Sequence, residues 1–298
     1  MRIFRMAAVR CAVWIAVLFG GLGAAGAAGA APALWVVKSD HAQIYLFGTL
    51  HALSPAAAAH WRTPLYDQVY AKAQTVWFET DVEGADPLVI SNLMSRLGVD
   101  PDRSLSQKLK APEVDALSHE TDLKRIDHLR PWAAALMLSM QPVQAGGAQV
   151  QSGADITVTR DARAAAKPVK FFETLEDQAH LFADLPEPAE VRYLSDVIKE
   201  RARPRVSLTR AEPLEQAWLD GDLARLGPAL VGEMKTNNPA LYQALLKGRN
   251  ERWAEQLARE LALGPKVELV NVGALHMVGD DGLPALMKAR GYTVERIQ

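Results

Sequence analysis

Cysteine is almost absent from this chain of 298 residues, which contains only Cys11. A single cysteine cannot form an intramolecular disulfide, and a chain cleaved after residue 30 would contain no cysteine at all. Thiolate catalysis is then excluded in the mature protein as well. Any metal ion would have to be held by histidine, aspartate or glutamate side chains.

Long apolar runs and an excess of basic charge are also missing from most of the chain. Beyond residue 35 no apolar run reaches the ~18 residues of a membrane-spanning helix, so we expect no membrane span in the mature chain. The 33 Lys and Arg residues are outnumbered by 35 Asp and Glu, and removing residues 1–30, with their three arginines, lowers the net charge from −2 to −5. Without a basic patch, nucleic-acid binding is not expected.

The first thirty residues have the composition of a secretory signal peptide. Three arginines precede the apolar segment Cys11–Phe19, and glycine and alanine with small-x-small cleavage sites follow. The pattern predicts cleavage near residues 27–33 and a periplasmic or secreted mature protein comprising residues 31–298. The alternative is an uncleaved membrane anchor, because the uncharged stretch 11–35 is long enough to span a bilayer.

What the chain does contain is a repeated pattern of strand, glycine and histidine. In VELVNVGALHM, residues 267–277, a short β-favouring run ends in Gly273, and His276 follows three positions later. Residues 43–51, QIYLFGTLH, repeat this pattern and end in His51. Because glycine permits a turn at the end of each strand, both histidines are predicted to lie just past a buried strand.

Two glutamates repeat in the same way. Residues 75–80 (TVWFET) and 169–174 (VKFFET) are β-rich runs that place Glu79 and Glu173 at strand ends. In an open α/β sheet, ligands bind outside the carboxyl ends of the strands. Two histidines and two glutamates at four such ends therefore predict a shared site, and these residue types suit a divalent metal ion.

The order of the predicted elements indicates an α/β fold. Strands alternate with helices, which favours a mostly parallel central sheet with flanking helices. Helical periodicity dominates at about residues 86–141 and 187–263, so we expect a large helical insertion or second lobe. Residues 34–47 are typical of a hairpin, and the C-terminal segment of a strand, loop, helix and final strand. We treat residues 31–298 as one domain.

Several segments together resemble the TraB/PrgY/GumN family, in particular its GumN-like branch. The resemblance covers the chain from about Leu34 to the C-terminus. The segments that carry it are GTLH at 48–51, FET at 78–80, SGAD at 152–155, KPVKFFETLEDQ at 167–178, Arg249-Asn250 and NVGALHMVGDDGLPALMKARGYTV at 271–294. The family is related to the Tiki metal-dependent proteases, and more distantly to erythromycin esterases and haem-binding ChaN-like proteins.

The resemblance implies roles for individual residues. It makes His51, Glu79 and His276 the metal-site candidates, with Glu173 as a further carboxylate. The other motif positions are Asp155, Arg249 and Asn250.

Asp155 and Arg249 each have a plainer interpretation. Asp155 could cap a helix starting at Ile156, or it could orient a ligand histidine. Arg249 could bind a substrate carboxylate or carbonyl, or it could form an ordinary ion pair.

The function predicted first is a metal-dependent hydrolase, most simply a Tiki-like peptidase acting on a peptide or protein substrate. His51, His276 and a carboxylate would hold a divalent ion such as Mn, Co, Zn or Fe. One of Glu79 and Glu173 would serve as ligand, with Glu79 favoured, and the other as general base. Two alternatives are a non-catalytic protein that binds metal, haem or peptide, and a metal-free esterase-like hydrolase with a histidine base.

Overall fold

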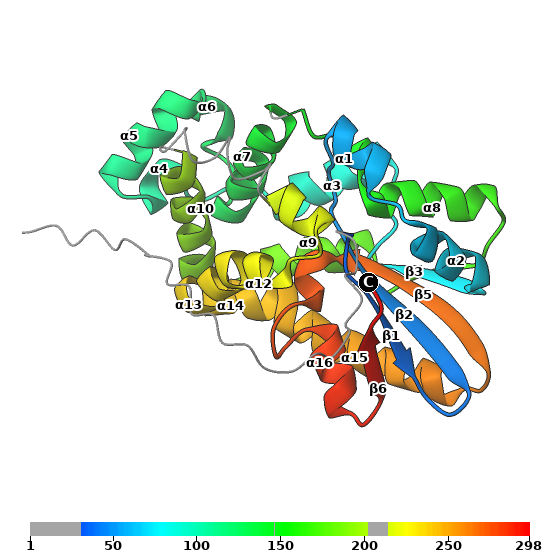
Figure 1. Cartoon of the computed structure of the whole chain (residues 1–298). Coiled ribbons are helices and arrows are strands. Elements are labelled where there is room, and N and C mark those ends of the chain that lie inside the picture. The colour runs from blue at the N-terminus through cyan, green and yellow to red at the C-terminus, as the bar shows by residue number, and fades with distance from the viewer. Residues whose placement is uncertain (1–30, 146, 202–213) are drawn as a thin grey trace, which may run out of the picture.

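The computed structural model describes residues 31–145, 147–201 and 214–298 (Figure 1). The predicted signal peptide, residues 1–30, lies outside the described residues. Within those ranges, no helix combines the length and the apolar character needed to cross a membrane.

One six-stranded sheet forms the centre of the fold. Its strands are β1 (Leu34–Lys38), β2 (Ala42–Thr49), β3 (Thr75–Phe78), β4 (Val169–Phe171), β5 (Lys266–Gly273) and β6 (Thr293–Arg296). They are ordered β4-β3-β5-β2-β1-β6. The four strands β4, β3, β5 and β2 are mutually parallel, whereas β1 is antiparallel to both β2 and β6. The predicted mostly parallel sheet is confirmed, and β1 and β2 form the predicted hairpin. The last strand, β6, pairs with β1 and is separated from β5 by two strands.

Helices cover both faces of the sheet because side chains alternate along each strand. On one face α1, α2 and α8 pack over Val76, Phe78 and Leu269. On the other, α15 and α16 pack over Trp77 and Val270. The bounds of these helices are α1 (Pro55–His60), α2 (Pro64–Lys72), α8 (Ala154–Ala164), α15 (Gly248–Ala262) and α16 (Leu283–Ala289).

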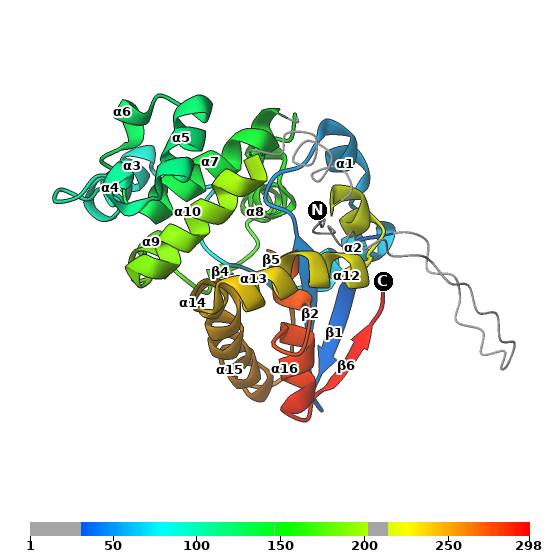
Figure 2. The same ribbon diagram turned by 90° about the vertical axis from the view of Figure 1, so that its left-hand side faces the viewer.

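A second group of helices forms a separate lobe, which Figures 1 and 2 show beside the carboxyl ends of the parallel strands. Its own apolar core includes Leu117, Leu138 and Leu194. Its helices are α3 (Pro87–Leu97), α4 (Leu105–Lys108), α5 (Ala111–Glu120), α6 (Leu123–Ile126), α7 (Pro131–Ala145), α9 (Leu175–Ala183) and α10 (Glu187–Arg201). This lobe contains the helical segment predicted at about residues 86–141. Of the segment predicted at about 187–263 it contains only α10, because α15 packs on the sheet.

The remaining helical segments are short. Most lie between the lobe and the sheet along the chain, whereas η4 follows β5 and precedes α16. Residues 214–219 are also helical. The segments are η1 (Val150–Ser152), α12 (Leu223–Leu226), η2 (Gly227–Gly232), α13 (Glu233–Asn237), α14 (Pro239–Tyr242), η3 (Gln243–Lys247) and η4 (Ala274–Met277).

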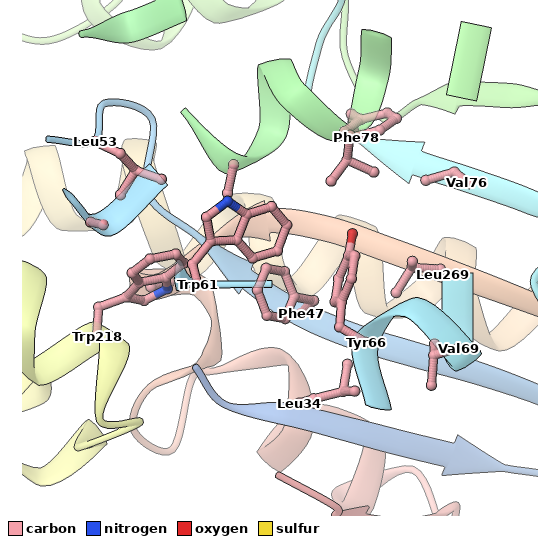
Figure 3. Close-up of a cluster of buried hydrophobic side chains, with 14 of the residues drawn as sticks. Leu34, Phe47, Leu53, Trp61, Tyr66, Val69, Val76, Phe78, Trp218 and Leu269 are labelled. Carbon is pink, nitrogen blue, oxygen red and sulfur yellow. The ribbon is translucent and has the colours of Figure 1, made fainter. Parts of the chain in front are cut away.

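An aromatic cluster anchors the chain that follows β2. Phe47 lies 4.6 Å from Tyr66 and 5.4 Å from Trp61 between ring centroids. Figure 3 shows these rings together with Trp218. The Trp218 indole N–H donates to the carbonyl of Gly48, with 2.7 Å between nitrogen and oxygen. The exit of β2 is therefore held by packing and by a buried hydrogen bond.

The strand register brings the ends of four parallel strands together. Thr49 pairs with Gly273, and Phe78 pairs with Asn271 on one side and Phe171 on the other. Residues one to three positions beyond these pairs consequently lie side by side, although they are distant in the sequence.

Candidate functional site

All seven predicted site residues meet at the carboxyl ends of the parallel strands. Each is linked to another through a contact between side chains. His51 follows β2, Glu79 follows β3, Glu173 follows β4 and His276 lies in η4 after β5. The other three residues lie on helices: Asp155 in α8, Arg249 and Asn250 in α15. Strand order places these positions together because β3, β5 and β2 are neighbours.

His51 lies at the open side of the site. Its Nδ1 donates to Oδ2 of Asp155 across 3.1 Å, and its Nε2 lies 3.9 Å from Oε1 of Glu79. The surrounding protein atoms lower the pKa of His51, but the carboxylates of Asp155 and Glu79 outweigh this effect and raise it to about 9. Because 59% of the side chain is exposed, solvent screens these charge interactions. The ring is protonated at neutral pH when no other cation lies against it.

His276 lies at the closed side. Its Nδ1 donates to Oδ1 of Asn250 across 2.6 Å, and its Nε2 accepts from Arg249 across 3.1 Å. Burial lowers the pKa of His276 to about 3. The ring is therefore neutral at pH 7, with the proton on Nδ1.

Glu79 lies between the two histidines. Its Oε1 is 3.7 Å from Nε2 of His276 and accepts a backbone hydrogen bond from Gly273 across 2.6 Å. Its Oε2 accepts from Arg249, also across 2.6 Å. Burial by itself would raise the pKa of Glu79, but Arg249 and these hydrogen bonds hold it well below its usual range. Glu79 is an ionised carboxylate within 4 Å of both imidazoles.

Arg249 joins both glutamates. Its Nε lies 3.1 Å from each oxygen of Glu173, and its Nη2 lies 2.8 Å from Oε2 of the same residue. The guanidinium also lies 4.5 Å from the ring centroid of Trp253. Although burial opposes the charge, the two carboxylates raise the pKa of Arg249. Glu173 is thus engaged by an arginine, and the cation lies where the two glutamates would otherwise repel each other.

Asp155 does not cap a helix. The helix α8 begins at Ala154, Gly153 is its N-cap residue, and no side chain makes a cap hydrogen bond there. Asp155 lies in the first turn and binds His51 instead. A side chain at Gly153 would place its Cβ 2.5 Å from the carbonyl oxygen of His51. Glycine is therefore required for the close approach that brings Asp155 to the histidine.

Gly273 is needed for space and not for a turn. Its backbone angles, φ −50° and ψ 139°, are open to any residue. A Cβ at this position would lie 3.1 Å from Nε2 of His51 and 3.2 Å from Oε1 of Glu79. The expectation that glycine supplies conformational freedom at this strand end is wrong, because the requirement is steric.

A cavity of about 160 Å³ opens beside His51. Glu79 and Asp155 line it, together with Thr80 and Asn271, which the sequence analysis did not single out. Asn271 had a signal in the sequence, because it is the one polar residue in the apolar stretch 269–273 that ends β5. Two further neighbours were missed: Gln178, 3.4 Å from Glu79, and Arg252, 3.6 Å from Glu173. Gln178 ends the motif segment 167–178 and Arg252 follows Arg249-Asn250 by two positions, so both lay beside motif residues in the sequence.

The donor types at this site fit a divalent metal ion. Each histidine has its Nδ1 bound to a side-chain oxygen, which is the outer-shell arrangement of metal-ligating histidines, and both Nε2 atoms lie near one carboxylate. Ligand atoms of a four-coordinate ion lie roughly 3.3 Å apart, so spacings of 3.7 and 3.9 Å are somewhat wide. As the side chains stand, no three His, Cys, Asp or Glu residues in the described ranges are grouped to hold a metal ion. A metal bound through His276 requires Arg249 to release Nε2.

Comparisons with known proteins agree with the resemblance seen in the motifs. The sequence model of the TraB/PrgY/gumN family matches residues 33–296. The chain is 24% identical over 268 residues to the uncharacterized protein YbaP of Escherichia coli (strain K12), an alignment covering 86% of this chain and 92% of YbaP. The same values hold for the uncharacterized protein YbaP of Shigella flexneri. No solved structure matches. Because the family match extends over nearly all of the described residues, the chain belongs to the TraB/PrgY/gumN family.

Proposed function

We propose that this protein is a metal-dependent hydrolase that cleaves peptide bonds, and that it acts in the periplasm or after secretion. The observation that carries the proposal is the matched geometry of the ring nitrogens of the two histidines. Both have Nδ1 fixed by a side-chain oxygen, and both have Nε2 within 4 Å of the same oxygen of Glu79.

The residues that would hold the ion are His51, His276 and Glu79. A divalent ion such as Mn, Co, Zn or Fe supplies a bound water of lowered pKa and polarises a carbonyl when it is present. Asp155 and Asn250 keep the two rings in the tautomer that leaves Nε2 available. The proton on Nε2 of His51 has to leave before that nitrogen can act as a ligand.

The two glutamates take different roles in this proposal. Glu79 lines the cavity and faces both imidazoles, so it belongs to the reacting centre. Glu173 is bound by Arg249 and does not line that cavity. We therefore assign Glu79 the ligand role, and Glu173 the role of holding Arg249. Glu173 could act as a general base only after Arg249 has moved away.

A metal-free hydrolase is the second candidate, and the bond between Asp155 and His51 favours it. A carboxylate that holds Nδ1 of a histidine while Nε2 faces a cavity is the arrangement of a general acid or base in nucleophilic hydrolases. Arg249 already neutralises the two buried glutamates, so this candidate needs no further cation. With a pKa of about 9, His51 would donate a proton more readily than accept one at neutral pH.

Elemental analysis of the purified protein tests the proposal. The wild type, His51→Ala, His276→Ala and a control, His41→Ala, are loaded in turn with Mn, Co, Zn and Fe and then desalted. His41 is an exposed turn residue away from the site. We expect close to one ion per chain in the wild type and in the control, and loss of the ion in both site variants.

Cleavage of a fluorescently labelled casein, before and after chelation, separates the two candidates. Cleavage that is lost on chelation and restored by one metal supports the first. If no metal is retained under any loading while all variants remain folded, the metal-dependent proposal is wrong. Casein cleavage that survives exhaustive chelation, and is lost in His51→Ala, would establish the metal-free candidate.

A further inference from the structure

The cavity beside His51 contains buried polar atoms that the fold leaves unused. Oγ1 of Thr80, Oδ1 of Asp155 and Nδ2 of Asn271 are inaccessible to solvent and have no hydrogen-bond partner among the described residues. All three residues line this one cavity. Thr80 is 7% exposed and Asn271 is completely buried. Unpaired buried polar atoms destabilise a fold, so three of them in residues around one cavity favour a ligand that pairs with them once small side-chain rotations bring them to the cavity surface.

Existing hydrogen bonds decide whether each unpaired atom can donate or accept. The hydroxyl of Tyr66 donates to Oδ1 of Asn271 across 2.8 Å, which leaves the Nδ2 hydrogens as donors. In Figure 3 the Tyr66 hydroxyl points towards Phe78. Oδ2 of Asp155 is bound by His51, which leaves Oδ1 as an acceptor. The hydroxyl of Thr80 can donate or accept.

Strand alternation explains why Thr80 and Asn271 serve the cavity. Asn271 lies on the same face of β5 as Leu269, the face covered by α2 and α8. Thr80 lies two positions beyond Phe78, which also packs on that face. The intervening residue Glu79 reaches Arg249 on α15. Glu79 also lines the cavity, so the two residues that follow β3 both contribute polar side chains to it.

We propose that this cavity, which we name the amide pocket, binds an amide group of the substrate. Nδ2 of Asn271 donates to the amide carbonyl, Oδ1 of Asp155 accepts from the amide N–H, and Thr80 completes the set. Phe78, Val150 and Ile156 supply apolar walls for the carbon atoms on either side. The assignment of an amide substrate to this pocket rests on the proposed function and specifies it further. An ester lacks the N–H and would leave Asp155 unpaired, so the amide pocket selects amides over esters.

Methyl NMR on the full chain tests binding without any turnover. The methyl groups of Val82, Val150 and Ile156 line the cavity and serve as reporters. N-methylacetamide and methyl acetate are titrated in the presence of a chelator. They differ only in that the ester has an oxygen atom where the amide has its N–H group. We expect N-methylacetamide to shift these methyl signals at a concentration at least about 10-fold lower than methyl acetate. A third titration with acetamide distinguishes the two sources of an amide: tighter binding of N-methylacetamide indicates a main-chain amide, and tighter binding of acetamide a side-chain carboxamide.

Two variants test the polar atoms themselves. Thr80→Val removes a hydroxyl that has no partner, so it should leave the melting temperature unchanged or higher while weakening N-methylacetamide binding several-fold. Asn271→Leu removes the donor and should weaken binding further, with Tyr66 losing its acceptor. Tyr70→Phe is the matched control, because it removes another buried hydroxyl without a partner in the described chain, away from the cavity. It should leave binding unchanged.

Equal affinities for the amide and the ester would overturn the proposal, and so would wild-type binding in Thr80→Val and Asn271→Leu together. Either result would mean that water alone pairs with the three atoms. Binding requires neither metal nor catalysis in this design. A protein that binds the amide but retains no metal and cleaves no casein would therefore contradict the proposed function and leave the amide pocket standing.

Discussion

The two histidines of the repeated motif have nearly opposite surroundings. The His51 side chain is 59% exposed, pairs with Asp155 and has a pKa raised to about 9. The His276 side chain is 4% exposed, pairs with neutral Asn250 and has a pKa lowered to about 3. One ring is charged and the other neutral at pH 7, although the local sequence before each is glycine, a small residue and leucine. Burial and the charge of the neighbour, and not the motif, set the protonation state.

The contrast extends to the two sides of Glu79. On the closed side, Arg249, Glu173, His276 and Asn250 bind one another. On the open side, the cavity beside His51 keeps polar atoms without partners. A paired buried network rigidifies a fold, whereas unpaired atoms at a cavity are a feature of ligand sites. In the proposed function, the closed side acts as the support and the open side binds the substrate.

The largest effect is expected from breaking the closed side with Arg249→Met. The variant leaves two buried carboxylates without their cation, and loss of one partner from a buried ion pair costs about 3–5 kcal/mol. Urea unfolding at pH 7 should show this loss in the free energy of unfolding. Arg259→Met on the same helix removes only an exposed pair with Glu255 and should cost about 0–1 kcal/mol. Equal losses in the two variants would contradict the buried network described here.

A smaller effect is expected when each histidine loses the side chain that holds its Nδ1. Asn250→Ala leaves the buried Nδ1–H of His276 and the carbonyl of Asp281 without a partner, which should cost about 1–3 kcal/mol. Asp155→Ala should cost less, because His51 remains in contact with water. Urea unfolding gives both values, and nitrogen NMR of the rings gives the tautomers. The reverse order of stabilities would show that the open side, and not the closed side, supports the fold.

The two histidines should contribute to the pH dependence of the unfolding free energy with opposite signs. Between about pH 6.5 and 3 an unfolded His276 takes up a proton that the folded ring does not, so its contribution to stability is present at neutral pH and is lost as the pH falls through this range. The pKa of folded His51 is raised, so its contribution is present below about pH 6.5 and is lost as the pH rises towards 9. Screening by solvent keeps the His51 effect the smaller of the two.

His276→Gln and His51→Gln check this pair of signs in chelated protein. The first variant should flatten the acid slope of the unfolding free energy, and the second the alkaline slope. If both variants flatten the same slope, the two rings do not differ in charge as described.

The smallest effect on stability is expected from Gly273→Ala. The backbone there suits alanine, so the free energy of unfolding should change by no more than about 1 kcal/mol. The new methyl group would lie against Nε2 of His51 and Oε1 of Glu79, and it should push them apart. NMR should then show a lower pKa for His51, because the Glu79 carboxylate is more distant. Gly232→Ala, where a Cβ meets nothing within 4 Å, should leave that pKa unchanged.

The strands and the residues at their ends could be predicted from the amino-acid sequence. Apolar runs with β-favouring side chains identified β2, β3, β4 and β5, and the helices between them predicted that these strands are parallel. Since parallel strands share one carboxyl edge, the motifs alone were enough to predict that His51, Glu79, Glu173 and His276 meet there. The repeated motif supplied this information because strand ends are encoded locally.

The separate roles of these residues depend on tertiary contacts. The helix α15 brings Arg249 to both glutamates. No spacing in the sequence indicates that Glu79 lines the cavity and that Glu173 does not. Asp155 turned out to bind His51 because Gly153 allows α8 to approach the β2 exit closely. Only the cavity connects Thr80 with Asn271 and Asp155. Burial, partner charge and free space depend on contacts between segments distant in the chain, and a local sequence pattern does not contain them.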